Sequence, residues 1–162
     1  MEEEEQSESR IFVWWDVQSC VVPRGYDPLR ICGAIKSAME SLGFWGSLQV
    51  AAVGDGKRIT KDMVERFIAT GIEFESVDME VEHGNQYRIF SSIDKWKRLQ
   101  YPPGTVVVVI SSDSGYRPIL RSLRESGFRT VNFSKPDWYK VLDLGPRLDP
   151  RQYGFAPILE EG

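Results

Sequence analysis

The run Thr105–Ile110 narrows the possible folds more than any other part of the chain. It reads Thr-Val-Val-Val-Val-Ile, so every residue in it is β-branched, and such residues favour strands because a helix restricts their side chains. A second run, Ile11–Trp15, is also apolar at every position. Neither run shows the polar alternation of a strand with one face in water. Both are typical of strands buried on two faces, as in a parallel sheet covered by helices.

Segments with strand and helix patterns alternate along the rest of the chain. Residues 48–53, 72–77 and 129–133 predict three more strands. Asp27 before Pro28, and Thr60 further on, are N-capping residues that mark helix starts. We therefore predict an α/β fold of three layers (α/β/α), with a Rossmann-like, mainly parallel five-stranded sheet in the order 3-2-1-4-5. The predicted helices cover residues 28–42, 61–70, 86–99 and 118–126.

Length and charge indicate one domain with two different ends. The chain has 162 residues, of which 41% are apolar, enough for a single core. We predict a disordered acidic tail at 1–9, a folded domain at 10–134 and an irregular extension at 135–162 that is rich in Pro and Gly. The net charge of −4 comes mostly from the tail. Since the body is close to neutral, contact with phosphate would depend on local basic patches.

The composition excludes several classes of protein. No stretch approaches the ~20 apolar residues of a membrane span, and the acidic start does not resemble a signal peptide. We therefore expect an intracellular protein with no membrane partner. Cys20 and Cys32 show no metal-binding spacing and are expected to be reduced thiols. His83 is the only histidine, which excludes a multi-histidine metal centre.

Three of the predicted strands are followed by an aspartate: Asp16, Asp55 and Asp113. In the predicted sheet order these strands are neighbours, so their carboxyl ends would bring the three side chains to one edge. Oxygen ligands without histidine suit Mg²⁺ or Mn²⁺, which could activate water against a phosphodiester. The alternative is structural, because aspartate is also common in loops and as a helix N-cap.

Three segments resemble a known family in the expected order. Val13–Cys20 reads V-W-W-D-V-Q-S-C, Ala52–Asp55 reads A-V-G-D, and Ile110–Tyr116 reads I-S-S-D-S-G-Y. They resemble the motifs of limkain-type NYN domains in the PIN-like nuclease superfamily, over residues 11 to about 134. The resemblance implies a PIN-like fold and a Mg²⁺-dependent endoribonuclease of RNA metabolism, acting in post-transcriptional regulation. Asp16 and Asp113 would hold the metal, and Asp55 would assist.

The departures from the family pattern fall on the site itself. Gln18 and Ser19 stand where the family has a Glu-Asn pair, and Gly115 replaces the second acid of its D-x-D motif. Counting without gaps places Tyr87 on the aspartate of the third motif, K-N-x-x-D-R. Each lost carboxylate removes a ligand or a group that orients one. We therefore predict weak or absent catalysis, with a non-catalytic RNA-binding or protein-binding module as the alternative.

Basic residues provide candidate contacts for the phosphates of single-stranded RNA. Arg117, Arg121 and Arg124 recur at helical spacing after Asp113. Lys57 and Arg58 follow Asp55, with Lys61 close behind. We predict that these groups bind RNA, the alternative being a solvated helix face.

Two further expectations concern alternatives and location. A receiver-like phospho-switch with Asp78 as acceptor is the third candidate, since Lys135-Pro136 follows the last strand. The resemblance implies a cytoplasmic protein, with association with RNA granules or peroxisomes, although the C-terminal Glu160-Glu161-Gly162 is not a peroxisomal address. Protein partners and the oligomeric state are left open.

Overall fold

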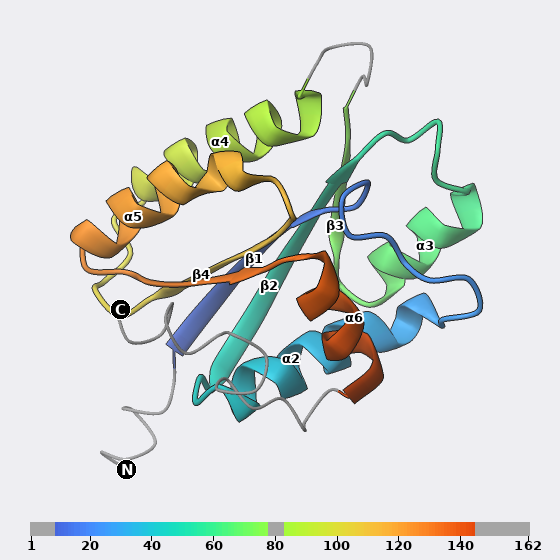
Figure 1. The fold of residues 1–162 in the computed structure, drawn as a ribbon, viewed down its shortest axis with the longest axis horizontal. Coiled ribbons are helices and arrows are strands. Elements are labelled where there is room, and N and C mark those ends of the chain that lie inside the picture. The colour runs from blue at the N-terminus through green and yellow to red at the C-terminus, as the bar shows by residue number, and fades with distance from the viewer. Residues whose placement is uncertain (1–8, 78–82, 145–162) are drawn as a thin grey trace.

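Five parallel strands form one sheet at the centre of the molecule (Figure 1). The computed structural model describes residues 9–77 and 83–144. The strand order is β3-β2-β1-β4-β5, and all four neighbouring pairs are parallel. The predicted order 3-2-1-4-5 is confirmed. The strands are β1 (Ser9–Asp16), β2 (Gly46–Gly54), β3 (Glu73–Ser76), β4 (Val106–Ile110) and β5 (Arg129–Phe133).

Helices cover the two faces of the sheet and complete the three predicted layers. Helices α4 (Gly84–Lys97) and α5 (Arg117–Glu125) cover one face, and the other helices cover the opposite face (Figure 1). The second layer contains α2 (Ile31–Ser41), α3 (Lys61–Ala69) and α6 (Lys135–Leu144). Two short 3-10 turns, η1 (Pro28–Arg30) and η2 (Ser114–Tyr116), precede α2 and α5.

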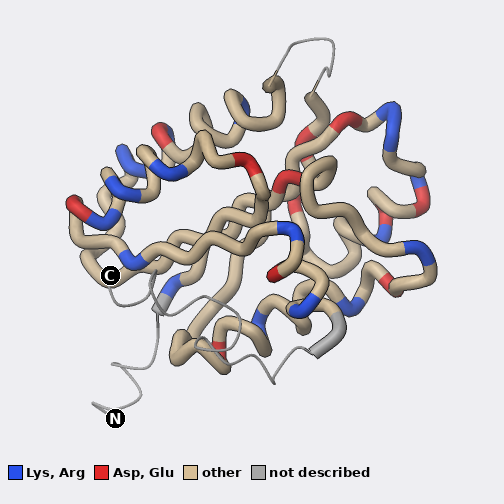
Figure 2. Tube along the Cα trace, in the orientation of Figure 1, with Lys and Arg blue, Asp and Glu red and all other residues tan. Residues whose placement is uncertain are grey.

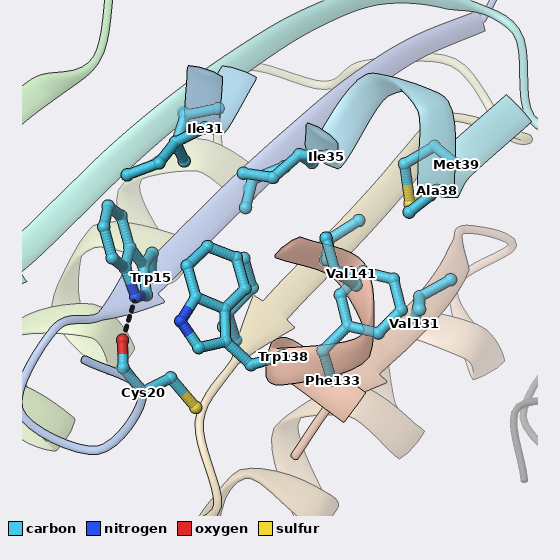
Figure 3. Packing of buried hydrophobic residues seen from close by; sticks show 14 of the residues in the cluster. Trp15, Cys20, Ile31, Ile35, Ala38, Met39, Val131, Phe133, Trp138 and Val141 are labelled. Carbon is cyan, nitrogen blue, oxygen red and sulfur yellow. Dashed lines mark hydrogen bonds between the residues drawn. The ribbon is translucent and has the colours of Figure 1, made fainter. Parts of the chain in front are cut away.

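The apolar runs form the two-sided core that the sequence predicts. All five residues of β4 are fully buried. On β1, Trp14 and Trp15 belong to the cores on opposite sides of the sheet. Their indole nitrogens donate to Ser92 Oγ at 2.9 Å and to the Cys20 carbonyl at 2.7 Å. Figure 3 shows Trp15 packed near Trp138 and Ile31 in the larger of the two cores.

The predicted helix starts are formed by the expected side chains. Asp27 accepts a hydrogen bond from the Leu29 backbone at 3.0 Å, and Thr60 accepts one from Met63 at 3.1 Å. Gly43 and Gly71 follow α2 and α3 with positive φ angles of 95° and 91°, a backbone conformation that glycine adopts without strain. Local sequence signals therefore set these helix ends.

The prediction of an irregular segment from residue 135 is wrong for residues 135–144, which form α6. Ser134 is linked to Asp137 by two hydrogen bonds, from its backbone N–H at 3.0 Å and from its hydroxyl at 2.8 Å. Pro136 lies in the first turn, where a missing N–H costs no hydrogen bond. Trp138 and Val141, one helical turn apart, are both fully buried. The proline therefore marks the start of a helix and not an irregular segment.

Four other predictions concern the two chain ends, the cysteines and membrane spans. The predicted acidic tail lies outside the described residues except for Ser9, which begins β1, and residues 145–162 of the predicted extension also lie outside them. Cys20 and Cys32 are both free thiols, as expected. No helix in the described part of the chain is long and apolar enough to cross a membrane.

Candidate functional site

The three aspartates that follow strands lie along one edge of the sheet. Asp16 is the last residue of β1 and pairs with Val53, one residue before the end of β2. Asp55 directly follows β2, and Asp113 comes three residues after the last residue of β4. Since β2, β1 and β4 are adjacent and parallel, their carboxyl ends meet at this edge, as predicted. We call the group of polar residues there the carboxyl-edge cluster: Asp16, Gln18, Asp55, Asn85, Ser111 and Asp113.

Asp16 is a buried carboxylate of the carboxyl-edge cluster. It is 7% exposed, and protein groups donate to both of its oxygens. Oδ1 accepts from Asn85 Nδ2 at 2.9 Å and from the Ser19 backbone at 3.3 Å, and Oδ2 accepts from Ser111 Oγ at 3.3 Å. Burial raises the pKa of Asp16, and these hydrogen bonds offset only part of that rise.

Asn85, in the first turn of α4, connects two strand ends. Its Nδ2 donates to Asp16 Oδ1 and also to Gln18 Oε1, at 2.8 Å. Gln18 Oε1 in turn accepts from the Asp55 backbone at 2.9 Å, which fixes it as an acceptor. The amide of Asn85 must therefore turn its N–H groups toward these two oxygens. Asn85 is 5% exposed, and its Oδ1 has no hydrogen-bond partner among the described residues.

Asp55 and Asp113 are held by contacts within their own loops. Asp55 is 7% exposed; its Oδ1 accepts from the Lys57 backbone at 2.9 Å, and Oδ2 lies 3.5 Å from Arg58 Nε. Asp113 caps η2 by accepting from the Gly115 backbone at 2.9 Å. The Asp113 backbone donates to Ser111 Oγ at 3.1 Å. Ser111 therefore links Asp113 to Asp16. Asp113 also has the structural role of a helix N-cap, which is the alternative that the sequence left open for these aspartates.

The positions that depart from the family pattern have structural roles of their own. Gln18 bridges β1 and β2 through Asp55, and Ser19 Oγ accepts from the Ser112 backbone at 2.8 Å. The amide of Gln86 occupies the space into which a Cβ at Gly115 would project. A side chain at position 115 would therefore require Gln86 to move.

In the segment that the count assigns to the third motif, the side chain next to Asp16 belongs to Asn85. Tyr87, which that count puts on the family's aspartate, is 58% exposed and points away from the buried side of α4. Asn85 reaches Asp16 instead. Asn85 lies four residues before Ile89 and eight before Ile93, both fully buried. This helical spacing is the sequence signal that indicates which residue faces the sheet.

The predicted basic residues divide between the two ends of the sheet. Lys57 and Arg58 lie in the loop after β2, and Arg117 begins α5 just after η2; all three are exposed. Arg121 is one turn further along α5 and also exposed. Arg124 Nη1 donates to Thr130 Oγ1 at 3.0 Å, near the amino end of β5. The structure therefore brings Lys57, Arg58 and Arg117 to the carboxyl edge and places Arg124 away from it.

The charge distribution separates these basic groups. Figure 2 shows basic residues along α4 and α5 on one side and near the loop after β2 on the other, with acidic positions at the strand ends between them. The body of the chain is close to neutral, so any electrostatic attraction of a ligand depends on such local groups. Dissolved salt screens the interaction between exposed charges that lie far apart. The carboxyl edge is therefore an acidic strip with basic groups beside it.

The donor set of the cluster does not fit a Mg²⁺ or Mn²⁺ site as it stands. Such ions require several negative or carbonyl oxygens directed at one point. Here N–H and O–H groups of Asn85, Ser19 and Ser111 are directed at the Asp16 carboxylate. Within residues 9–77 and 83–144, no three His, Cys, Asp or Glu side chains are grouped so that they could hold a metal.

The fold and the position of this edge are consistent with a PIN-like domain, which has three layers, a parallel 3-2-1-4-5 sheet and acidic side chains at the carboxyl edge. Residues 10–141 match the family model of the NYN domain, and the chain belongs to this family. The matched region includes most of α6. A search of curated proteins gave no relative that matches this chain.

Family membership supplies the coarse function. NYN domains are nuclease-like domains with RNA-related functions, and they typically depend on divalent metals. The match also leaves the receiver-like hypothesis without support, and its proposed acceptor Asp78 lies outside the described residues.

Proposed function

We propose that this protein is a limkain-type NYN domain that binds single-stranded RNA in post-transcriptional regulation and has weak or absent nuclease activity. The observation that carries the proposal is the environment of Asp16. Its oxygens accept hydrogen bonds from Asn85, Ser19 and Ser111. A carboxylate satisfied in this way contributes to the fold and offers little to a cation.

The charge of the cluster supports the same proposal. Metal-assisted phosphodiester cleavage requires negative oxygens that hold the ion and orient the attacking water. At two positions this chain has the neutral Gln18 and Gly115 in place of acids. Asp55, a third acid, lies against Arg58. The site therefore has less negative charge and fewer free oxygens than such chemistry requires.

Exposed groups beside the cluster support a role in RNA binding. Lys57, Arg58 and Arg117 are exposed cations at the carboxyl edge, where they can approach phosphates. Because these few charges are local, we expect modest affinity that falls steeply with salt. We expect the protein in the cytoplasm. The family resemblance alone suggests association with RNA granules or peroxisomes. We also expect a protein partner to add specificity.

A binding and cleavage assay tests the proposal. The full chain is mixed with end-labelled single-stranded RNA in Mg²⁺ or Mn²⁺, and binding is followed by fluorescence anisotropy and cleavage by gel. We expect binding with little or no cleavage. The double variant Lys57→Ala/Arg58→Ala should bind roughly tenfold more weakly at low salt, because it removes two phosphate contacts. Arg124→Ala is the control and should bind like the wild type, since Arg124 lies away from the edge.

The alternative function is a metal-dependent endoribonuclease, which the three retained aspartates favour. Efficient RNA cleavage, with many turnovers per protein molecule, that disappears in both Asp16→Asn and Asp113→Asn would overturn the proposal of weak or absent catalysis. Cleavage that persists in both variants would come from a contaminating nuclease and would leave the proposal standing.

A further inference from the structure

A basic surface lies where α4 ends and β1 begins, far from the carboxyl edge. Four cations form it, and we call them the basic end of α4: Arg10, Lys95, Lys97 and Arg98. The guanidinium carbon of Arg10 lies 5.2 Å from the centre of the Tyr101 ring, and that ring is stacked on Trp96 at 5.3 Å between centroids. These two contacts place Arg10 beside the last turn and the C-cap of α4, which carry the other three cations.

The positive charge of this surface is only partly compensated. Within residues 9–77 and 83–144, none of the four cations forms an ion pair. Two acids lie near them: Asp94 precedes Arg98 by one turn, and Glu73 lines the same cavity as Lys95. Four cations against two acids leave an excess of two positive charges. The surface can therefore attract a negatively charged segment.

The first eight residues of the chain carry the opposite charge. They read Met-Glu-Glu-Glu-Glu-Gln-Ser-Glu, with five acids and no cation. These residues lie outside the described ones, and β1 begins directly after them at Ser9, one residue before Arg10. Eight extended residues span about 27 Å. That length is several times the contacts that join Arg10 to Trp96, so the acids can reach the last turn of α4.

Attachment to the same chain makes weak ion pairs sufficient. A single exposed ion pair contributes little to stability. A segment that a few residues join to its binding surface, however, has an effective concentration in the millimolar range. Five acids can then exchange among four cations without a fixed structure. Such binding weakens as salt screens the charges.

We propose that the acidic segment, residues 1–8, binds the basic end of α4 and competes there with RNA. The segment fits this surface by its charge, its length and its attachment one residue before Arg10. The competition rests on the proposed function, because it requires that RNA phosphates also bind these cations. RNA then gains access to the basic end of α4 only by displacing the segment.

NMR relaxation of the ¹⁵N-labelled full chain tests the binding of the segment without RNA. The heteronuclear NOE of the amides of residues 2–6 reports how strongly their motion is restricted. We expect higher values at low salt than in about 0.5 M NaCl, where the charges are screened. The double variant Lys95→Gln/Arg98→Gln should have the lower values even at low salt, because it removes half of the surface cations.

The double variant Arg24→Gln/Lys36→Gln is the matched control. It removes the same two kinds of charge from exposed positions outside α4, and it should keep the NOE values of the wild type. Equal values in the wild type and in Lys95→Gln/Arg98→Gln overturn the inference. An equal fall in the control also overturns it, because net charge and not this surface would then restrict the segment.

Fluorescence anisotropy with single-stranded RNA tests the competition. One variant neutralises four acids of the segment: Glu2→Gln/Glu3→Gln/Glu4→Gln/Glu5→Gln. We expect it to bind RNA roughly threefold more tightly than the wild type at low salt. In the Lys95→Gln/Arg98→Gln background the same four changes should have little effect, because the segment no longer covers a binding surface. An equal gain in both backgrounds would mean that the acids repel RNA from a distance, and it overturns the competition.

The two experiments separate this inference from the proposed function. NOE values that fall as expected in a chain that binds no RNA support the binding of the segment and contradict the proposed function. RNA binding that weakens in Lys95→Gln/Arg98→Gln while the NOE values stay unchanged shows that RNA alone uses this surface. That result overturns the inference and leaves the proposed function standing.

Discussion

The carboxyl-edge cluster and the aromatic core under α4 use polar groups in different ways. At the carboxyl edge, hydrogen bonds join the side chains of Asp16, Gln18 and Asn85, although Asn85 Oδ1 has no partner among the described residues. Under α4, Trp14 Nε1 donates to Ser92 Oγ, whereas the buried Nε1 of Trp96 has no partner among the described residues. A buried polar group that stays unpaired lowers stability. The comparison teaches that hydrogen bonds hold the carboxyl edge together, whereas packed rings form most of the core under α4.

The largest effect on stability should follow from a charge placed inside the carboxyl-edge cluster. Asn85→Asp removes the donor between Asp16 and Gln18 and sets two buried carboxylates against each other. We expect a loss of about 3 kcal/mol in the free energy of unfolding without divalent ions. Mn²⁺ should restore part of it, because the new pair of carboxylates is a set of ligands for a cation.

Thermal unfolding with EDTA or with Mn²⁺ measures this effect. Asn85→Ala is the matched control, since it loses the same hydrogen bonds without adding a charge, and Mn²⁺ should not rescue it. The wild type should show no stabilisation by Mn²⁺. A wild-type melting temperature that rises with Mn²⁺ as much as that of Asn85→Asp would contradict the conclusion that the Asp16 carboxylate is paired with Asn85 and not with a cation.

The core under α4 is tested by Ser92→Ala. This change removes the acceptor of the Nε1 of Trp14, a residue that is 5% exposed. It therefore leaves a second unpartnered indole beside that of Trp96. We expect a loss of about 1 to 2 kcal/mol, the usual cost of leaving a buried donor unpaired. Chemical denaturation measures the free energy of unfolding for both proteins.

Ser91→Ala on the same helix is the control for Ser92→Ala. Ser91 is exposed, so its loss should change stability by less than about 0.5 kcal/mol. Equal effects of the two substitutions would mean that helix propensity, and not the hydrogen bond to Trp14, determines the result.

The fold was predictable because its signals are local in the sequence. The β-branched run from Thr105 predicted β4, whose residues are all fully buried, and Asp27 and Thr60 predicted helix caps that the structure forms. The start of α6 was missed because the whole segment from residue 135 was interpreted as irregular from its Pro and Gly content, although Ser134 and Asp137 form hydrogen bonds at the helix start. A proline permits both outcomes, and the apolar spacing that follows it decides between them.

The site was predictable in position but not in its contacts. Strand ends predicted that Asp16, Asp55 and Asp113 would share an edge, which follows from parallel topology alone. The bond between Asn85 and Asp16 joins residues 69 positions apart, and no local pattern encodes such a pair. Side-chain partners depend on helix rotation and on the exact placement of α4, which a motif count transferred from a family does not contain.

The smallest expected effect concerns pH and asks whether the hydrogen bonds around Asp16 fully compensate its burial. Its pKa is raised in the folded protein because burial outweighs the bonds from Asn85, Ser19 and Ser111. The folded state therefore binds the proton more tightly than the unfolded state. The resulting stabilisation is complete below the unfolded pKa of 3.8 and is lost as pH rises through the higher folded value.

Denaturant unfolding of the wild type and of Asp16→Asn, compared at several pH values from 3.5 upward, isolates this contribution, since the other carboxylates are common to both. We expect the stability of the wild type to fall relative to Asp16→Asn as pH increases; a constant difference would show that the hydrogen bonds of the cluster offset the burial of Asp16 completely.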